Sequence, residues 1–266
     1  MSELRRSIGA LKGRVVRELG AGVARAKRRR HPEQYRSGVT VLTVNWNSLA
    51  FLQGMLDAIR AVSPMDTEIL VVDNGSSDGS VRFLQGRDDV RLLRLPVNLG
   101  HGVALDIGVA AIDTEYVAVL DVDAFPVSSG WLDESIAALD SGAQVAGAHM
   151  HRNFVHPCFF VARTKVLHDL DLTFRPVGSL AGLDRGAPLF LDVGEALSQR
   201  VIVKFGGGQS LHFFEITDAL GPGPAGAVFG GIVYHNMFAT QGTGQGSALD
   251  VFQSQLHRHH PELDSL

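Results

Sequence analysis

The sequence has one cysteine, Cys158, among 266 residues. A lone cysteine cannot form an internal disulfide, which excludes the disulfide-stabilised folds of small secreted proteins, and we interpret Cys158 as a small buried residue. No apolar run approaches the roughly 20 residues of a membrane-spanning helix. The first residues also lack the apolar core of a signal peptide. We therefore expect a cytoplasmic protein whose length is sufficient for one large hydrophobic core.

Acidic residues are scarce in the first thirty positions. This segment contains ten Lys and Arg residues but only two acidic residues, Glu3 and Glu18, which gives it a net charge of +8. Because the net charge of the whole chain is −4, the remaining residues carry a net charge of −12. Apolar residues recur at helical spacing in this segment, at Leu4, Ile8, Leu11, Val15, Leu19 and Val23. This pattern is typical of a basic amphipathic helix on an anionic membrane surface, here the inner face, or of a solvated tail. The acidic remainder without a reading motif argues against nucleic-acid binding.

Strand-like and helix-like segments alternate after Pro32. Apolar strands are expected at 39–44, 68–72, 90–95 and 116–120, and helices at 48–62, 81–85 and 102–112. This alternation predicts a single doubly wound α/β domain, with a Rossmann-like mixed sheet flanked by helices. We divide the chain into a basic segment 1–37, a domain 38–240 with halves 38–127 and 128–240, and a mobile tail 241–266 rich in Gly, Gln, Ser and His.

Two carboxylates follow the buried strand at 116–120. Asp121 and Asp123 are two positions apart, so on an extended chain they face the same way and can hold one divalent cation. The alternative is a polar loop with Asp as turn former. Asn45 and Asp73 also follow strand ends, and ligands of such sheets bind outside the carboxyl ends of the strands. Three polar residues at one sheet edge favour a ligand site.

Four sequence blocks carry a resemblance to a known family. They are residues 41–48 (VLTVNWNS), 69–80 (ILVVDNGSSDGS), 98–102 (NLGHG) and 121–123 (DVD). In this order and spacing the chain resembles the family 2 glycosyltransferases, a bacterial group with the GT-A fold. The resemblance runs from about residue 39 to 131. It implies an inverting, metal-dependent transfer of a sugar from a nucleotide-diphosphate donor to a hydroxyl of a glycan, a lipid-linked saccharide or a small metabolite.

The resemblance also implies roles for individual residues. It assigns the donor to Val44, Asn45, Trp46, Asp73, Asn98, Gly100 and Asp121. Asp121, Asp123 and the late His235 would hold Mg²⁺ or Mn²⁺, which bridges the two phosphates of the donor. Two alternatives stay open: Asp73 as a residue that merely opens the Asn-Gly turn, and His235 as an ordinary strand-end histidine.

The catalytic base is less clearly marked. Family members carry it on a later helix, often in a Glu-Asp pair, but here Leu191 precedes Asp192. Asp192 is the candidate base and Glu195 the reserve, because residues three apart on the helix predicted at 189–200 share a face. Asp192 could instead only interact with the dipole at the helix N-terminus. Nearby histidines could line an acceptor pocket; these are His149, His151 and His156.

Two other functions remain compatible with the sequence. The missing Glu-Asp pair would suit a catalytically silent protein that binds a nucleotide or a glycan. A nucleotidyltransferase of similar architecture would favour a Gly-rich loop with Arg or Lys after the first strand. That position reads Asn45-Trp46-Asn47-Ser48, which disfavours it.

Overall fold

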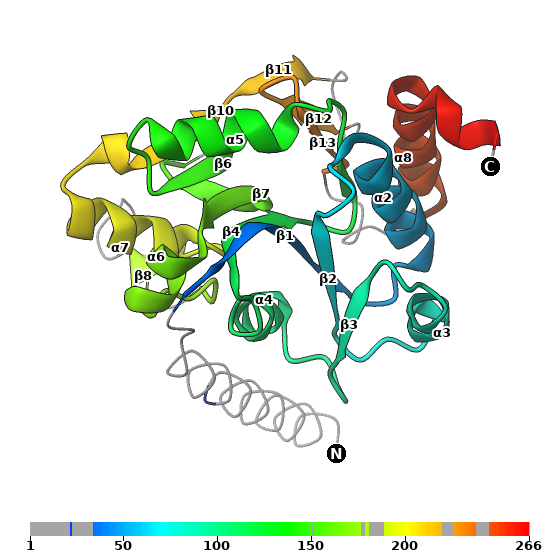
Figure 1. Cartoon of the computed structure of the whole chain (residues 1–266), viewed down its shortest axis with the longest axis horizontal. Helices are drawn as coiled ribbons and strands as arrows, with labels where there is room; N and C mark the ends of the chain where they lie inside the picture. Colours follow the sequence, from blue (N-terminus) through cyan, green and yellow to red (C-terminus); the bar gives the residue numbers. More distant parts are fainter. Residues whose placement is uncertain are drawn as a thin grey trace.

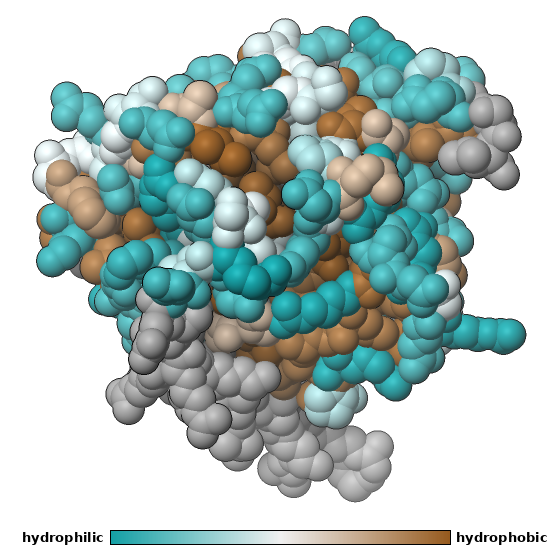
Figure 2. Space-filling model, in the orientation of Figure 1, coloured by the Kyte–Doolittle hydropathy of each residue, from teal (hydrophilic) through white to brown (hydrophobic). Residues whose placement is uncertain are grey.

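The computed structural model describes residues 34–150, 152–176, 189–219, 226–237 and 245–265, together with Gly22, Ser179 and Leu180. The predicted basic helix therefore lies outside the described residues, apart from Gly22. None of the described helices is long and apolar enough to cross a membrane. Hydrophilic residues cover most of the face shown in Figure 2, and apolar residues show through around the middle of it.

A seven-stranded mixed sheet forms the centre of the molecule, in the order β10-β6-β7-β4-β1-β2-β3 (Figure 1). Its strands are β1 (Arg36–Asn45), β2 (Glu68–Asp73), β3 (Arg91–Arg94), β4 (Thr114–Leu120), β6 (Val145–His149), β7 (Val155–Arg163) and β10 (Leu211–Phe214). The first four run parallel to one another, whereas β7 is antiparallel to both β4 and β6. This arrangement confirms the predicted doubly wound, mixed α/β sheet.

Helices cover both faces of this sheet, each over its own apolar cluster. On one face lie α2 (Leu49–Val62), α5 (Trp131–Asp140) and α8 (Gln245–His259); on the other lie α4 (His101–Val109), α6 (Thr164–Asp169) and α7 (Glu195–Phe205). The short helix α3 (Ser80–Gln85) contacts the edge strand β3. In α2, Leu52, Leu56 and Ile59 are fully buried, the spacing expected of an amphipathic helix on a sheet.

A smaller antiparallel sheet carries the chain back to the end of β4. Its order is β11-β12-β13-β5, with β11 (Ile216–Ala219), β12 (Ala227–Phe229), β13 (Val233–His235) and β5 (Ala124–Pro126). His235 pairs with Ala124, and the Asn236 N–H donates to the Asp123 carbonyl at 2.9 Å. This register brings a histidine from late in the chain beside Asp123. Three further short elements are the β8 (Ser179–Leu180) and β9 (Leu189–Phe190) pair and the 3₁₀ turn η1 (Gly208–Ser210).

The predicted mobile tail is wrong for residues 245–265, which form α8 and the 3₁₀ turn η2 (Pro261–Ser265). Phe252 is fully buried, and its ring packs edge-on against Phe51 and Phe125. His260 is also buried and donates from Nε2 to the Pro126 carbonyl at 2.7 Å. The many Gly, Ser and Gln residues of this segment obscured a sparse row of apolar residues that packs on the core.

The helix predicted at 189–200 begins later than expected. Residues Leu189–Phe190 form β9, and α7 starts only at Glu195. Gly194 has φ = 83°, a left-handed conformation that favours glycine and separates Asp192 from the helix. The argument that Asp192 and Glu195 share a helix face is therefore wrong. Of residues 177–188, only Ser179 and Leu180 are described, and they form the short strand β8.

Candidate active site

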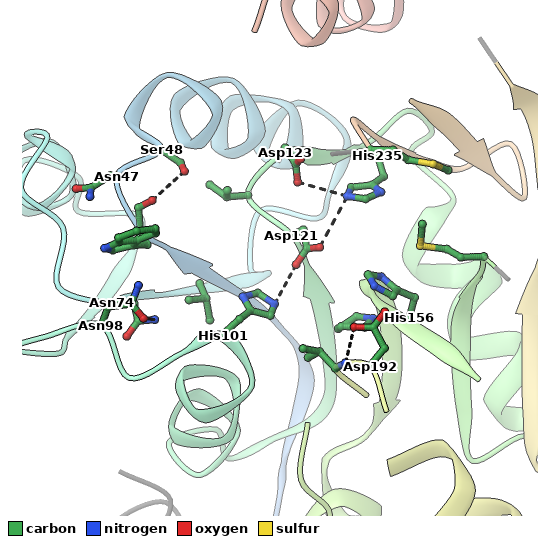
Figure 3. A pocket seen from close by; sticks show the side chains of 17 residues that line it. Asn47, Ser48, Asn74, Asn98, His101, Asp121, Asp123, His156, Asp192 and His235 are labelled. Carbon is green, nitrogen blue, oxygen red and sulfur yellow. Dashed lines mark hydrogen bonds and ion pairs between the residues drawn. The ribbon is translucent and has the colours of Figure 1, made fainter. Parts of the chain in front are cut away.

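Polar residues that follow the ends of β1, β2, β3 and β4 line one cavity of about 580 Å³. In Figure 3, Asn47, Ser48, Asn74 and Asn98 lie on the left, Asp121 and Asp123 in the middle, and His235, His156 and Asp192 on the right. The remaining lining residues are Val44, Trp46, His101, Val122, Met150, Pro157, Val193 and Met237. The cavity lies at the carboxyl ends of the parallel strands, where such sheets bind ligands.

Asp121, Asp123 and His235 form the centre of the site. Each offers one ligand atom, and these three atoms lie within 4.8 Å of one another. His235 Nε2 is 3.4 Å from Asp123 Oδ1 and 3.8 Å from Asp121 Oδ2. Two carboxylates and an imidazole suit Mn²⁺, and the carboxylates suit Mg²⁺ as well. The residues present therefore fit a divalent cation, with much of its shell left to other ligands.

The two aspartates meet at His235 for a different reason from the one predicted. The Ala124 N–H donates to the Asp121 carbonyl at 2.9 Å, so residues 121–124 form a turn rather than an extended strand. It is this turn, together with the pairing of β5 and β13, that places both carboxylates beside one imidazole. The alternation of side chains along a strand does not explain the arrangement.

Charges in the cluster are strongly coupled. Burial alone would raise the pKa of the Asp121 carboxyl, but interactions with His101, His235 and His156 outweigh it and hold that pKa well below its ordinary value. Burial alone would lower the pKa of His235, but its neighbours Cys158 and Asp123 outweigh it and raise that pKa well above its ordinary value. A divalent cation would compete with the proton for the His235 nitrogen, since a metal binds neutral imidazole.

His101 contacts Asp121, and the sequence did not predict this pair. Its Nε2 lies 3.1 Å from Asp121 Oδ1, at the first position of α4. Its position in the glycine-rich block 98–102 was the only signal, and it did not identify the partner.

Asn45 and Asp73 lie beneath the cavity rather than in its lining. Both are buried. Asn45 Nδ2 donates to Asp73 Oδ1 at 3.1 Å and to Ser76 Oγ at 3.0 Å, and Asp73 Oδ2 accepts the Ser76 N–H at 3.1 Å. These bonds hold the turn after β2, which agrees with the structural alternative for Asp73. The predicted donor contact of both residues stays a prediction.

The other predicted donor residues lie in or next to the lining. Val44, Asn98 and the half-exposed Trp46 face the cavity. Asn98 Oδ1 accepts bonds from Asn74 Nδ2 at 3.2 Å and from the Gly100 N–H at 2.8 Å. Gly100 itself is not a lining residue and has φ = 90° at the start of α4. Sequence reasoning missed Asn74 as a lining residue, although it follows Asp73 directly.

Asp192 and Glu195 have different places in the structure. Asp192 lines the cavity, and its Oδ1 accepts the Val193 N–H at 2.7 Å. Glu195 is buried behind it; its Oε2 accepts the Asp192 N–H at 2.9 Å and lies 3.0 Å from an Arg152 nitrogen. The reserve base is thus engaged by an arginine and by the backbone of the first candidate. Nothing in the sequence marked Arg152 as the partner of Glu195.

Only one of the three clustered histidines contributes to the described lining. His156 does so, and its ring centroid is 6.4 Å from that of His235. His149 is absent from that lining and pairs with Glu215 at 2.9 Å, and His151 lies outside the described residues.

Comparisons with known proteins agree with this picture. The sequence pattern of glycosyl transferase family 2 matches residues 40–175, just over half of the chain. A glycosyltransferase of Mycobacterium bovis is 35% identical over 102 residues, covering 35% of this chain and 45% of the relative. The poly-beta-1,6-N-acetyl-D-glucosamine synthase of Staphylococcus epidermidis is 28% identical over 93 residues, covering 34% and 23%. The chain thus spans less than half the length of either relative.

A solved structure matches a larger part of the chain. Glucosyl-3-phosphoglycerate synthase from Mycobacterium tuberculosis, in complex with Mn²⁺, UDP-glucose and phosphoglyceric acid, aligns with a TM-score of 0.50 and 17% identity. The alignment covers 73% of this chain and 73% of that one. At this identity the likeness concerns the fold, which is GT-A. Because the sequence pattern of the family extends over more than half of its length, the chain belongs to glycosyl transferase family 2.

Proposed function

We propose that the chain is a metal-dependent glycosyltransferase that transfers a sugar from a nucleotide-diphosphate donor to an acceptor hydroxyl with inversion. The observation that carries the proposal is the cluster of Asp121, Asp123 and His235 in a cavity that Asp192 also lines. The family and the fold support it. A similar fold has been solved with Mn²⁺ and a UDP-sugar, which fits a donor of this class.

On the donor side, the chain offers one exposed aromatic ring and several amides. Trp46 can stack on the nucleobase, and the side chains of Asn47, Asn74 and Asn98 can bond to ribose and phosphate oxygens. The buried Asn45–Asp73 pair holds the turn that carries Asn74. A bound Mg²⁺ or Mn²⁺ would neutralise the diphosphate as it leaves.

On the acceptor side, Asp192 is the proposed base. It would take the proton of the acceptor hydroxyl while that oxygen bonds to the anomeric carbon from the face opposite the diphosphate. The bond to the diphosphate breaks as the new bond forms, which inverts the anomeric configuration. Glu195 is a positioning residue, because it contacts the Asp192 backbone and Arg152.

A thermal-shift panel of nucleoside diphosphates, with and without Mn²⁺, tests the donor half of the proposal. A ligand at a hundred times its Kd stabilises the native state by about 2.7 kcal/mol, which raises Tm by about 5–10 °C for a chain of this size. We expect one nucleotide to give such a shift only with the metal. The absence of any metal-dependent shift across the panel would refute the proposal.

One specific observation favours a second function. The Glu-Asp pair of the family is missing at Leu191-Asp192, so the chain could bind a nucleotide or glycan without catalysis. Donor hydrolysis and transfer to a panel of acceptor alcohols separate the two functions. Turnover that falls in Asp192→Asn while nucleotide binding persists supports the enzyme; nucleotide binding without any turnover supports the silent protein. The loop after β1 gives no support to a nucleotidyltransferase.

We also propose that residues 1–30 attach the protein to the inner, anionic face of a membrane, which would suit a lipid-linked acceptor. The support is the basic, amphipathic pattern of that segment. Flotation with anionic liposomes tests this. The full chain should rise with the liposomes and a chain beginning at residue 31 should not; equal flotation of the two would contradict the idea.

A further inference from the structure

The lining of the proposed active site changes its chemistry from one side of β4 to the other. Asn47 and Ser48 follow β1, Asn74 follows β2, and Asn98 follows β3, so this side offers amides and a hydroxyl besides the apolar Val44 and Trp46. The strands β7, β6 and β10 lie beyond β4 in the opposite direction. The lining residues from that part of the fold are Met150 after β6, His156 and Pro157 in β7, and Asp192 and Val193 before α7. The smaller sheet adds His235 and Met237, so four of these seven residues are apolar.

Two of these apolar residues lie beside the segment that carries the candidate base. Val193 follows Asp192 directly in the chain, and a Cβ added at Gly194 would lie 3.2 Å from the Pro157 ring. Met150 and Met237 are only partly buried, and both pack on the same apolar cluster beneath the cavity. Methionine is unbranched and polarizable, so it adapts to irregular apolar surfaces of a ligand. The acceptor hydroxyl that Asp192 deprotonates would therefore arrive next to an apolar wall.

Charge on this side of the cavity disfavours an anionic acceptor. Among the lining residues in the described part of the chain there is no lysine or arginine, whereas Asp121, Asp123 and Asp192 are all present. The nearby Arg152 pairs with Glu195 at 3.0 Å. Of the three lining histidines, His101 and His235 pair with Asp121 and Asp123. A phosphate or carboxylate bound beside Asp192 would therefore face a like charge with His156 as the one lining cation within the described residues to compensate, which costs affinity.

We infer that the acceptor is a neutral alcohol with an apolar group beside its reacting hydroxyl, such as an alkyl or aryl glycoside. The apolar group would lie against Met150, Val193 and Met237. This inference rests on the proposed glycosyl transfer, since it assigns the acceptor of that reaction.

Binding of three small probes tests the inference. The full chain is saturated with Mg²⁺ and the nucleoside diphosphate that gives the largest metal-dependent thermal shift. Ligand-observed NMR then measures the affinity of phenyl β-D-glucoside, methyl β-D-glucoside and glucose 6-phosphate. Each buried CH₂ group contributes about fourfold in affinity, so a half-buried phenyl ring should bind about tenfold tighter than the methyl group or more. Glucose 6-phosphate should bind no tighter than the methyl glucoside.

A double variant identifies the surface responsible. Met150→Gln with Met237→Gln keeps the length of both side chains but replaces the thioether with an amide. We expect the preference for phenyl over methyl to fall below about threefold, because the amides must lose water to meet the ring. Met65→Gln is the matched control, since Met65 is 89% exposed and is not a lining residue; its preference should be unchanged.

Several results would overturn the inference: equal affinity for the phenyl and methyl glucosides, tighter binding of glucose 6-phosphate, no binding of any probe at millimolar concentration, or an unchanged preference in the double variant. Each of these leaves the proposed function standing if the metal-dependent nucleotide shift is still seen. If the unaltered chain shows no metal-dependent nucleotide shift, the proposed function itself is wrong.

Discussion

Phe252→Ala should be among the most destabilising single changes in the described core. The Phe252 side chain is fully buried, and its ring centroid lies 5.1 Å from that of Phe51 and 5.3 Å from that of Phe125, both edge-on. α8 approaches α2 closely at Gly54, where an added Cβ would lie 2.7 Å from a Leu256 methyl group and 2.9 Å from the Phe252 ring. There is little room for the neighbours to move into the space that the ring leaves.

The size of the effect follows from that geometry. Replacing a buried phenylalanine by alanine costs about 3–5 kcal/mol, and a tightly confined site belongs at the upper end, about 4 kcal/mol or more. A domain is stable by only about 5–15 kcal/mol, so much of the total is lost. For a chain of this length the Tm should fall by about 8–16 °C.

The change should also reach the active site. Phe252 contacts Phe125 of β5, which follows Asp123 and pairs with the strand that carries His235. A cavity behind β5 loosens the support of the proposed metal ligands. We therefore expect a smaller metal-dependent nucleotide shift in Phe252→Ala, measured at a temperature where the variant is still folded.

Urea unfolding followed by circular dichroism gives the free energy of unfolding by linear extrapolation. Gln253→Ala is the control, since Gln253 is exposed on the same helix and its loss should change stability by less than about 0.5 kcal/mol. A loss below about 1 kcal/mol in Phe252→Ala would mean that α8 does not pack on the core. The mobile tail expected from the sequence would then be correct.

Three further outcomes are expected. Asp123→Ala should abolish metal-dependent nucleotide binding, whereas Asp121→Ala should also weaken nucleotide binding without metal; unchanged thermal shifts in both would remove the pair from the site. Asp192→Asn should lower turnover by about 10²–10⁴-fold with the nucleotide shift intact; full activity would exclude it as the base. Gly147→Ala would place a Cβ 2.1 Å from a backbone carbonyl oxygen at φ = 152°, so it should unfold far more easily in urea than Gly142→Ala, where nothing lies within 4 Å; similar midpoints would contradict the close packing of β6 on β7.

Much of the half at residues 38–127 could be predicted because its signals are local. Strands such as β1 and β4 are buried on both faces and appear as apolar runs, and the polar residues at their carboxyl ends mark the ligand edge. Asp121 and Asp123 could be predicted as site residues from their position directly after β4 alone. Asp192 was misplaced because Gly194 adopts a left-handed conformation just before α7, which leaves Asp192 outside the helix.

The sequence by itself determined the alternating α/β order, the family and the aspartates of the site, because each depends on a short period or on nearby motifs. Only the tertiary structure decided which distant residues join them. The register of β5 and β13 places His235 beside Asp123. Arg152, which precedes β7, pairs with Glu195 at the start of α7. The burial of Phe252 depends on a surface made by α2 and β5. Such contacts depend on how elements far apart in the chain pack, which local patterns do not encode.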